Sequence, residues 1–184
     1  MSRDNQQYTP YYCEENIWQL CRQPQFSGMQ AQVLFISNAA QQCPFWWQKR
    51  LPPEQPVWWD YHVILAVKAA GWMVYDFEAA LPFPTALQKY FARTFQFIPA
   101  VESRVAPQFK IIPADEYSRD FYSDRMHMKN STGEWLAPPP DWPLITGSKK
   151  LPLAGLLDFT ATSPHEIFSL HEILDQFNNE RSAL

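Results

Sequence analysis

Two hydrophobic runs, 57–67 and 72–77, dominate the middle of the chain. Both are rich in β-branched and aromatic residues, and the four residues between them end in a glycine. This pattern is typical of an antiparallel hairpin. A turn centred near Ala69 places His62 and Asp76 opposite each other on one face of the sheet. A carboxylate in that position can hydrogen-bond the imidazole and fix its tautomer and orientation, as for the general base of a nucleophilic enzyme.

A helical periodicity follows Cys13. The apolar face of this predicted helix consists of Ile17, Trp18, Leu20 and Cys21. The helix begins at or just after Cys13, where unpaired N–H groups and the helix dipole favour a thiolate over a thiol. The adjacent Glu14 and Glu15 oppose this effect. Cys13 is therefore a candidate nucleophile, and the alternative is an ordinary buried thiol.

The other periodic segments are short. Strands are predicted at 32–36 and 109–112, and a turn of helix at 117–121. Two further helices follow capping patterns and are expected to end near Phe95 and Asn178. The two capping pairs are Thr85 with Gln88 and Ser169 with Glu172.

Proline-rich connections separate these elements. The segment 39–56 contains Trp46 and Trp47, which are either a wall of a substrate cleft or anchors packed on the core. Pro99 and Pro107 bound a second irregular crossing. Rigid loops around an aromatic-rich core are therefore expected.

A polar cluster at 123–128 allows two interpretations. Asp124 either borders the cleft and meets a cation of the substrate, or forms an internal brace with Arg125. His127 has no His, Cys or acidic partner at the spacing of metal ligands, and no metal site is predicted.

Composition limits the class of protein. The chain has 184 residues and is expected to form one domain, 1–184, with a loose segment at 1–9. A net charge of −4 without a basic stripe argues against nucleic-acid binding. No apolar run is long enough for a membrane span, and no signal peptide is expected. Three cysteines without a CxxC pair predict reduced thiols in a cytoplasmic protein.

Several long motifs resemble the protein N-terminal glutamine amidohydrolase family. The similarity runs in order from about residue 8 to 145, and more loosely to the C-terminus. The first motifs are Tyr12-Cys13-Glu14-Glu15-Asn16, Trp59-Asp60-Tyr61-His62-Val63, Val74-Tyr75-Asp76 and Leu81-Pro82-Phe83-Pro84. The later ones are Ser123-Asp124-Arg125, His127-Met128-Lys129, and Trp135 followed by Pro138-Pro139-Pro140.

The resemblance implies specific roles. The family's nucleophile corresponds to Cys13, its general base to His62 and the orienting carboxylate to Asp76. The substrate is the side-chain amide of an N-terminal glutamine in a protein or peptide, which is hydrolysed to glutamate through a thioester on the cysteine. No cofactor is needed, and a monomer is expected. In a eukaryote, the protein is expected in the nucleus as well as the cytoplasm, upstream of arginylation in degradation by N-termini.

The order of these residues also resembles the papain and transglutaminase core. It implies an α/β layered (α+β) domain with a mainly antiparallel central sheet flanked by helices. Selectivity for a terminal residue requires an acidic or carbonyl-rich notch that binds the free α-ammonium, and Glu14, Asp60 and Asp124 are the acidic candidates. Two other functions stay open: a transglutaminase or peptidase with the same triad, and a non-catalytic module that binds N-termini.

Overall fold

A six-stranded sheet forms the centre of the computed structural model, which describes residues 2–96, 103–148 and 150–179. Pro99 lies outside the described residues. Each neighbouring pair of strands in this sheet is antiparallel. Their order is β10 (Phe168–Ser169), β7 (Gln108–Pro113), β1 (Ala31–Ser37), β4 (His62–Lys68), β5 (Trp72–Tyr75) and β6 (Thr85–Ala86).

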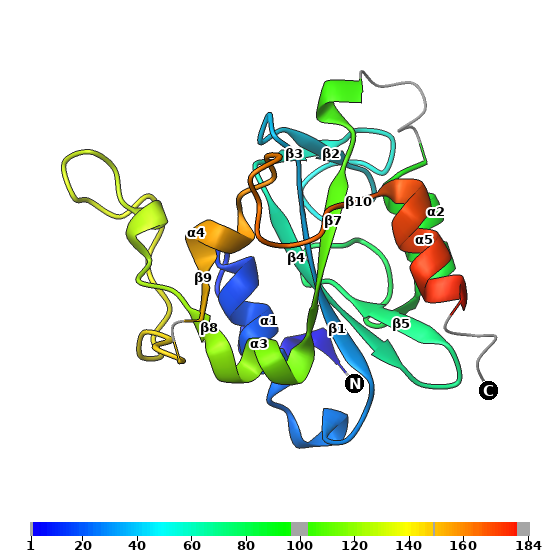
Figure 1. Ribbon diagram of the computed structural model, residues 1–184, viewed down its shortest axis with the longest axis horizontal. Coiled ribbons are helices and arrows are strands. Elements are labelled where there is room, and N and C mark those ends of the chain that lie inside the picture. Colours follow the sequence, from blue (N-terminus) through cyan, green and yellow to red (C-terminus); the bar gives the residue numbers. More distant parts are fainter. Residues whose placement is uncertain (1, 97–102, 149, 180–184) are drawn as a thin grey trace.

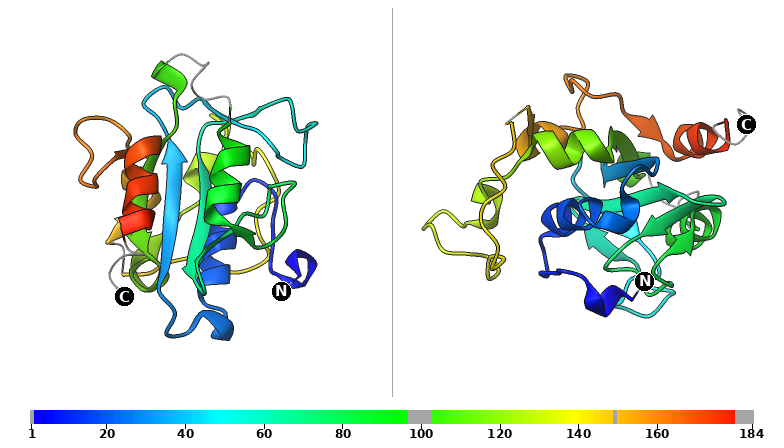
Figure 2. Two further views of the ribbon diagram at one scale, coloured as in Figure 1. Left: turned by 90° about the vertical axis from the view of Figure 1, so that its right-hand side faces the viewer. Right: turned by 90° about the horizontal axis from the view of Figure 1, so that it is seen from below.

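Helices cover both faces of the sheet (Figures 1 and 2). The first face carries α1 (Cys13–Cys21), α3 (Ala114–Asp120) and α4 (Leu153–Leu156), and the second carries α2 (Leu87–Thr94) and α5 (Leu170–Asn179). The predicted layered architecture with a mainly antiparallel sheet is therefore confirmed. The papain-like or transglutaminase-like core stays a prediction.

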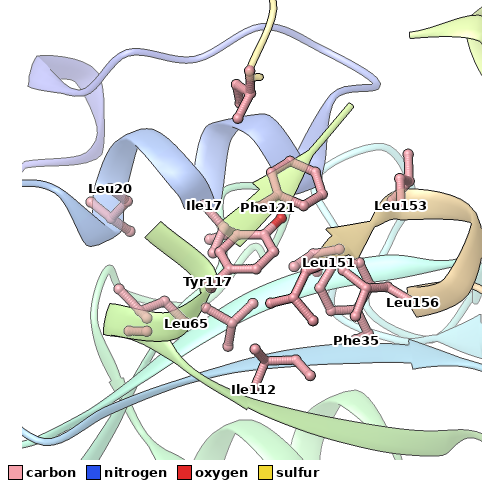
Figure 3. Packing of buried hydrophobic residues seen from close by; sticks show 14 of the residues in the cluster. Ile17, Leu20, Phe35, Leu65, Ile112, Tyr117, Phe121, Leu151, Leu153 and Leu156 are labelled. Atoms are coloured by element: carbon pink, nitrogen blue, oxygen red, sulfur yellow. The ribbon is translucent and has the colours of Figure 1, made fainter. Parts of the chain in front are cut away.

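Burial on both faces explains why the strand sequences read as continuous apolar runs. Along β4, Val63, Leu65 and Val67 pack toward α1 and α3, while Ile64 and Ala66 pack toward α2 and α5. Figure 3 shows the first of these cores, in which Tyr117 and Phe121 lie between α1 and the sheet. Their rings stack with centroids 4.5 Å apart.

The predicted hairpin forms with a different register. Leu65 pairs with Tyr75 and Lys68 with Trp72, so the turn is centred on residue 70 and not on residue 69. The prediction that His62 lies directly opposite Asp76 is therefore wrong. The three-residue turn is closed by a hydrogen bond from the N–H of residue 69 to the carbonyl of residue 71. A shift of two residues keeps both side chains on one face and makes them diagonal neighbours.

The residues before His62 belong to another sheet. β3 (Val57–Trp59) pairs with β2 (Cys43–Phe45), and this two-stranded sheet lies beside the end of β4. A second small sheet pairs β8 (Phe121–Tyr122) with β9 (Leu151–Pro152) in parallel. Single turns of 3₁₀ helix lie at Arg3–Asn5, Pro24–Phe26, Ser103–Val105 and Met126–Met128.

One predicted capping box is confirmed and the other is wrong. Ahead of α5, the N–H of Ser169 donates to Glu172 Oε2 at 2.7 Å, and the N–H of Glu172 donates to Ser169 Oγ at 3.3 Å. Ahead of α2, Thr85 is extended and pairs with β5, and its hydroxyl donates to the carbonyl of Pro82 at 2.6 Å. The helix therefore begins two residues later, without a side-chain cap.

The segment 2–12, expected to be loose over 1–9, makes defined contacts with the β5–β6 connection. The Arg3 guanidinium donates to the carbonyls of Asp76 at 3.2 Å and Leu81 at 2.9 Å. The Tyr8 hydroxyl donates to the Glu78 carboxylate. These contacts hold the approach to α1 against the connection that carries Asp76.

A buried ion pair ties α1 to the segment that follows β8. Arg125 Nε and Nη2 donate to the two oxygens of Glu15 at 2.8 and 2.7 Å, and Trp142 Nε1 donates to Glu15 Oε2 at 2.6 Å. Glu15 is fully buried, and the Arg125 side chain is 6% exposed. The predicted brace between Arg125 and Asp124 is therefore wrong, because the guanidinium is saturated by Glu15 and by backbone carbonyls.

We expect Arg125→Met to lower the free energy of unfolding by about 3–5 kcal/mol, because it leaves the Glu15 carboxylate buried without a partner. The double variant Glu15→Met/Arg125→Met should lose less, since it leaves no unpaired charge. Urea denaturation measures both. The control is Arg119→Met, which removes a guanidinium that is 62% exposed from Asp120; this buried carboxylate keeps the Ser148 hydroxyl as a donor, and the loss of stability should be much smaller. Equal losses in Arg125→Met and Arg119→Met would contradict the assigned role of the buried pair.

Candidate active site

A cavity of about 530 Å³ is lined by three of the six residues that the sequence singled out, namely Cys13, Asp60 and His62. The first residue of α1, Cys13, and the first residue of β4, His62, both line this active-site cavity. The cavity is also lined by Gln41, Trp59, Asp60, Tyr61, Val63, Glu78, His127 and Leu157.

His62 and Asp76 form a buried hydrogen-bonded pair. Nε2 of His62 lies 2.8 Å from Oδ1 of Asp76, and each side chain is 1% exposed. Asp76 Oδ1 also accepts the N–H of Glu78 at 2.8 Å, and Oδ2 accepts the Tyr90 hydroxyl at 2.8 Å. Burial alone would raise the pKa of Asp76, but the imidazole and these donors hold it below its ordinary value. The group is therefore an ionised acceptor that requires a proton on Nε2.

Aromatic contacts fix the plane of the imidazole. The Trp59 ring stacks on it with centroids 5.2 Å apart and planes at 15°, and Phe45 meets it edge-on at 5.4 Å. Nδ1 is buried and has no hydrogen-bond partner among the described residues. Since Nε2 carries the proton in neutral imidazole, Nδ1 is a buried acceptor that carries no proton.

Cys13 occupies the predicted position at the N-terminal end of α1. The N–H of Val63, the residue after His62, donates to the Cys13 sulfur. This contact places the sulfur against the start of β4. The thiol itself donates to Glu14 Oε2 at 3.6 Å. Among the described residues, no hydrogen bond joins the sulfur to the imidazole.

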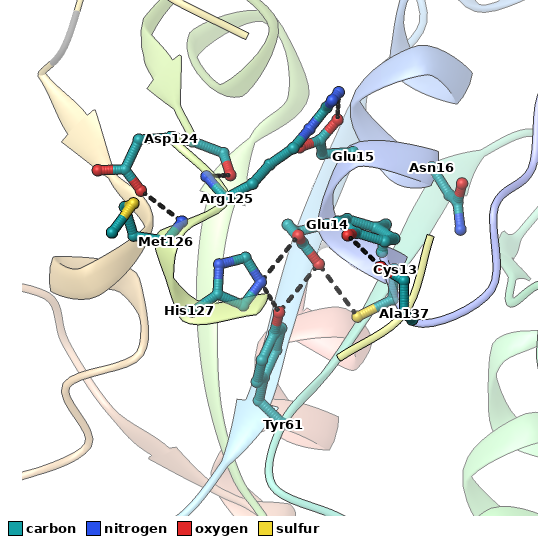
Figure 4. Close-up of polar contacts among 12 residues, drawn as sticks. Cys13, Glu14, Glu15, Asn16, Tyr61, Asp124, Arg125, Met126, His127 and Ala137 are labelled. Carbon is teal, nitrogen blue, oxygen red and sulfur yellow. Dashed lines mark hydrogen bonds and ion pairs between the residues drawn. The ribbon is translucent and has the colours of Figure 1, made fainter. Parts of the chain in front are cut away.

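Glu14 anchors a polar cluster beside the sulfur (Figure 4). The Tyr61 hydroxyl donates to Glu14 Oε2 at 3.0 Å and lies 3.2 Å from His127 Nε2. Because Glu14 takes the single hydroxyl proton, Nε2 of His127 is the donor to Tyr61. Glu14 is fully buried, and its Oε1 accepts no hydrogen bond, with His127 Nε2 3.5 Å away.

This environment favours the protonated thiol. Burial raises the pKa of Cys13 well above its ordinary value, and the charges of Glu14 and Asp60 raise it further. The N–H of Val63 opposes them. The helix start favours a thiolate, as predicted, but it does not outweigh burial and the two carboxylates.

Comparison with known proteins identifies the family. A family model described as N-terminal glutamine amidase matches residues 8–179. The chain belongs to this family. Similar curated proteins include the protein N-terminal glutamine amidohydrolases of Bos taurus and Homo sapiens. Both are 36% identical to this chain. Each alignment covers 97% of this chain, together with 90% of the Bos taurus protein and 91% of the Homo sapiens protein. That of Danio rerio is 38% identical over 92% of this chain and 88% of its own length.

The acidic candidates of this amidase-family site lie in different places. Asp60 lines the active-site cavity, is exposed, and accepts the N–H of Tyr61 at 2.9 Å through Oδ1. Glu14 lies behind the lining residues Cys13, Tyr61 and His127. Asp124 does not line this cavity. In Figure 4 its carboxylate points away from Cys13, on the far side of His127.

The sequence analysis did not identify several residues of the candidate active site. Tyr90, in α2, gave no functional signal in the sequence, yet its hydroxyl donates to Asp76. Trp59, and neither Trp46 nor Trp47, is the tryptophan of the cavity wall. Tyr61 and His127 lie within two of the family motifs, but nothing in the sequence predicts that residues 66 positions apart make contact. No three His, Cys, Asp or Glu side chains within 2–96, 103–148 and 150–179 are grouped to hold a metal ion.

We expect Glu14→Gln to accelerate alkylation of Cys13 by iodoacetamide at about pH 8 by roughly tenfold. The amide oxygen still accepts the Tyr61 hydroxyl, but the charge beside the sulfur is gone. The pKa of the thiol then falls, because one of the charges that raise it has been removed, and a larger share of the cysteine is thiolate. Peptide mass spectrometry follows the label, with Cys21 and Cys43 as internal controls. An unchanged or slower reaction of Cys13 would contradict the electrostatic assignment.

Proposed function

We propose that this protein is an amidohydrolase that converts N-terminal glutamine of peptides and proteins to glutamate and releases ammonia. Membership of the N-terminal glutamine amidase family supports this function. The observation that carries it is the buried imidazole of His62. Asp76 orients it through Nε2, its Nδ1 is unpaired, and it shares one cavity with a cysteine at a helix N-terminus.

The proposed reaction uses Cys13 as nucleophile and His62 as general base and acid. The thiol leaves Glu14 and gives its proton to Nδ1 of His62, and the sulfur attacks the γ-carbonyl carbon of the glutamine. His62 returns the proton to the departing ammonia, which leaves a thioester. A water molecule that loses a proton to Nδ1 then hydrolyses the thioester to glutamate and regenerates the thiol.

Backbone N–H groups at the start of α1 are proposed to stabilise the oxyanion of the tetrahedral intermediates. The first N–H groups of a helix have no carbonyl partner within the helix, and Cys13 is the first residue of α1. Loss of one such donor in an enzyme of this type costs roughly 2.7–4 kcal/mol in the barrier.

We further propose that Glu14 and Asp60 read the free α-ammonium. Asp60 supplies a carboxylate on the cavity wall. Glu14 lies one layer behind Cys13, Tyr61 and His127 and contributes a second negative charge, with its Oε1 3.5 Å from His127 Nε2. A bound ammonium offsets the charges of both carboxylates and so lowers the pKa of the Cys13 thiol, which these charges raise. The thiol thereby becomes reactive only after a chain terminus has bound. An internal glutamine carries no such charge.

The protein is proposed to act in the cytoplasm, where its three free thiols stay reduced. None of the described helices is long and apolar enough to cross a bilayer. Its proposed partners are proteins with N-terminal glutamine and not nucleic acids. The monomeric state stays a prediction, as does a place upstream of arginylation in a eukaryote.

The central prediction concerns three peptides that differ only at the first residue: Gln-initiated, N-acetyl-Gln-initiated and Asn-initiated. We expect a mass gain of about one dalton and release of ammonia from the first alone, since acetylation removes the charge that is read and asparagine is one methylene too short. Cys13→Ala should abolish the reaction. Peptide cleavage or incorporation of an added amine would instead indicate a peptidase or transglutaminase. Binding without turnover would indicate a recognition module.

A second prediction tests the reading of the ammonium. The double variant Glu14→Gln/Asp60→Asn should raise KM for a Gln-initiated peptide by about tenfold or more, because charged hydrogen bonds contribute about 1.5–3 kcal/mol. The matched control is Glu134→Gln, which removes an exposed carboxylate that does not line the cavity and should leave KM unchanged. An unchanged KM in the double variant would exclude both residues from this role.

A further inference from the structure

A second hollow adjoins the active-site cavity. Its volume is about 540 Å³, and it shares Gln41, His127 and Leu157 with the active-site cavity. Its remaining wall consists of Asn38, Ala39, Asp124, Met126, Leu153, Ala154, Asp158, Phe159 and Thr160. The two hollows are therefore neighbours across a rim of three side chains.

The rim is held in a defined conformation. Asn38 Oδ1 accepts the N–H groups of residues 40 and 42 at 3.0 and 3.1 Å, and its Nδ2 donates to the carbonyl of residue 42 at 2.9 Å. These bonds hold Gln41 in a left-handed conformation, with φ of 51°, which is uncommon for a residue other than glycine. The exposed Gln41 amide thus stands at the passage with a donor and an acceptor for a peptide backbone.

The charges of the second hollow have one sign. Asp124 and Asp158 line it, and no lysine or arginine does. Each uses Oδ1 for its own loop: Asp124 accepts the N–H of Met126 at 2.9 Å, and Asp158 accepts the N–H of Thr160 at 3.0 Å. The bonds from Thr160 lower the pKa of Asp158, so this carboxylate is ionised at neutral pH.

One neighbouring positive charge is already committed. The Lys110 ammonium lies behind the loop and donates to the backbone carbonyls of Gly155, Leu156 and Asp158. Met126, Leu153 and Phe159 add apolar surface around the carboxylates. A long aliphatic side chain that ends in a cation matches such a wall, because its stem packs on apolar atoms while its head meets the acids.

We infer that the second hollow binds the third and fourth residues of the peptide substrate and favours lysine or arginine there. The inference rests on the proposed function, which places the N-terminal glutamine at Cys13. The active-site cavity, with a volume of about 530 Å³, is large enough to enclose two residues of the peptide. The chain must then leave it, and the passage at Gln41, His127 and Leu157 leads an extended peptide into the acidic hollow.

The test uses Gln-Gly peptides that carry lysine or glutamate at position three or four, with all other residues glycine. We expect kcat/KM for ammonia release to be at least about threefold higher for the lysine peptide, mainly through KM, as for a pairing at a partly exposed site. The preference should shrink at about 0.5 M salt, where exposed charges are screened.

Variants locate the effect. Asp124→Asn and Asp158→Asn keep the oxygen that accepts the loop N–H but remove the charge. Each should lower the ratio of the two kcat/KM values toward one, and this ratio cancels any general change in activity. The matched control, Asp175→Asn, removes an exposed charge on α5 and should leave the ratio unchanged.

Three results of these assays would contradict the inference, each in a different way. Equal kcat/KM for the lysine and glutamate peptides overturns the inference and leaves the proposed function intact. A preference for lysine that survives in Asp124→Asn and Asp158→Asn overturns the location. Absence of ammonia from every Gln-initiated peptide overturns the proposed function, and the inference with it.

Discussion

The hydrogen bond between His62 and Asp76 is the constraint on which the candidate site depends. A carboxylate that is 1% exposed remains ionised only if donors surround it, and Asp76 has three: the imidazole, the N–H of Glu78 and the Tyr90 hydroxyl. These donors come from β4, the chain after β5, and α2, so the pair requires the whole sheet and the helix behind it. In return, the pair fixes which nitrogen of His62 is bare.

The surroundings of the sulfur impose the opposite condition. His62 requires a negative partner, whereas the thiol of Cys13 is held neutral by burial and by the carboxylates of Glu14 and Asp60. A cysteine that stays protonated until the ammonium of the substrate binds would react slowly with other electrophiles. The buried pair of Glu15 and Arg125 supports this arrangement, because it joins α1 to the segment that carries His127.

The sequence predicted the elements better than it predicted the contacts between them. β1, β4, β5, β7 and the first helix follow from local periodicity, and the last helix follows from its capping box. The single strand predicted over 57–67 is divided between two sheets. The hydrogen bond of His62 with Asp76 forms despite the wrong register, because a shift of two residues preserves the sheet face. Local rules failed where tertiary contacts decided the outcome. Thr85 was drawn into a strand, and Arg125 was paired with Glu15 across the fold. The role of Tyr90 could not be predicted, because a hydroxyl on an apolar helix face gives no signal in a single sequence. Tyr61 belongs to a family motif, but its contacts with Glu14 and His127 depend on the tertiary fold.

The protonation state of the His62 ring tests the account most directly. In protein labelled with ¹⁵N-histidine, the account predicts that neutral His62 carries its proton on Nε2, with Nδ1 unprotonated. Asp76→Asn should weaken this preference, because the amide N–H₂ can donate to Nε2 and so favour a proton on Nδ1. A proton on Nδ1 in the unaltered protein, with Nε2 bare, would contradict the account, because the acceptor nitrogen would then be the one that lies against Asp76.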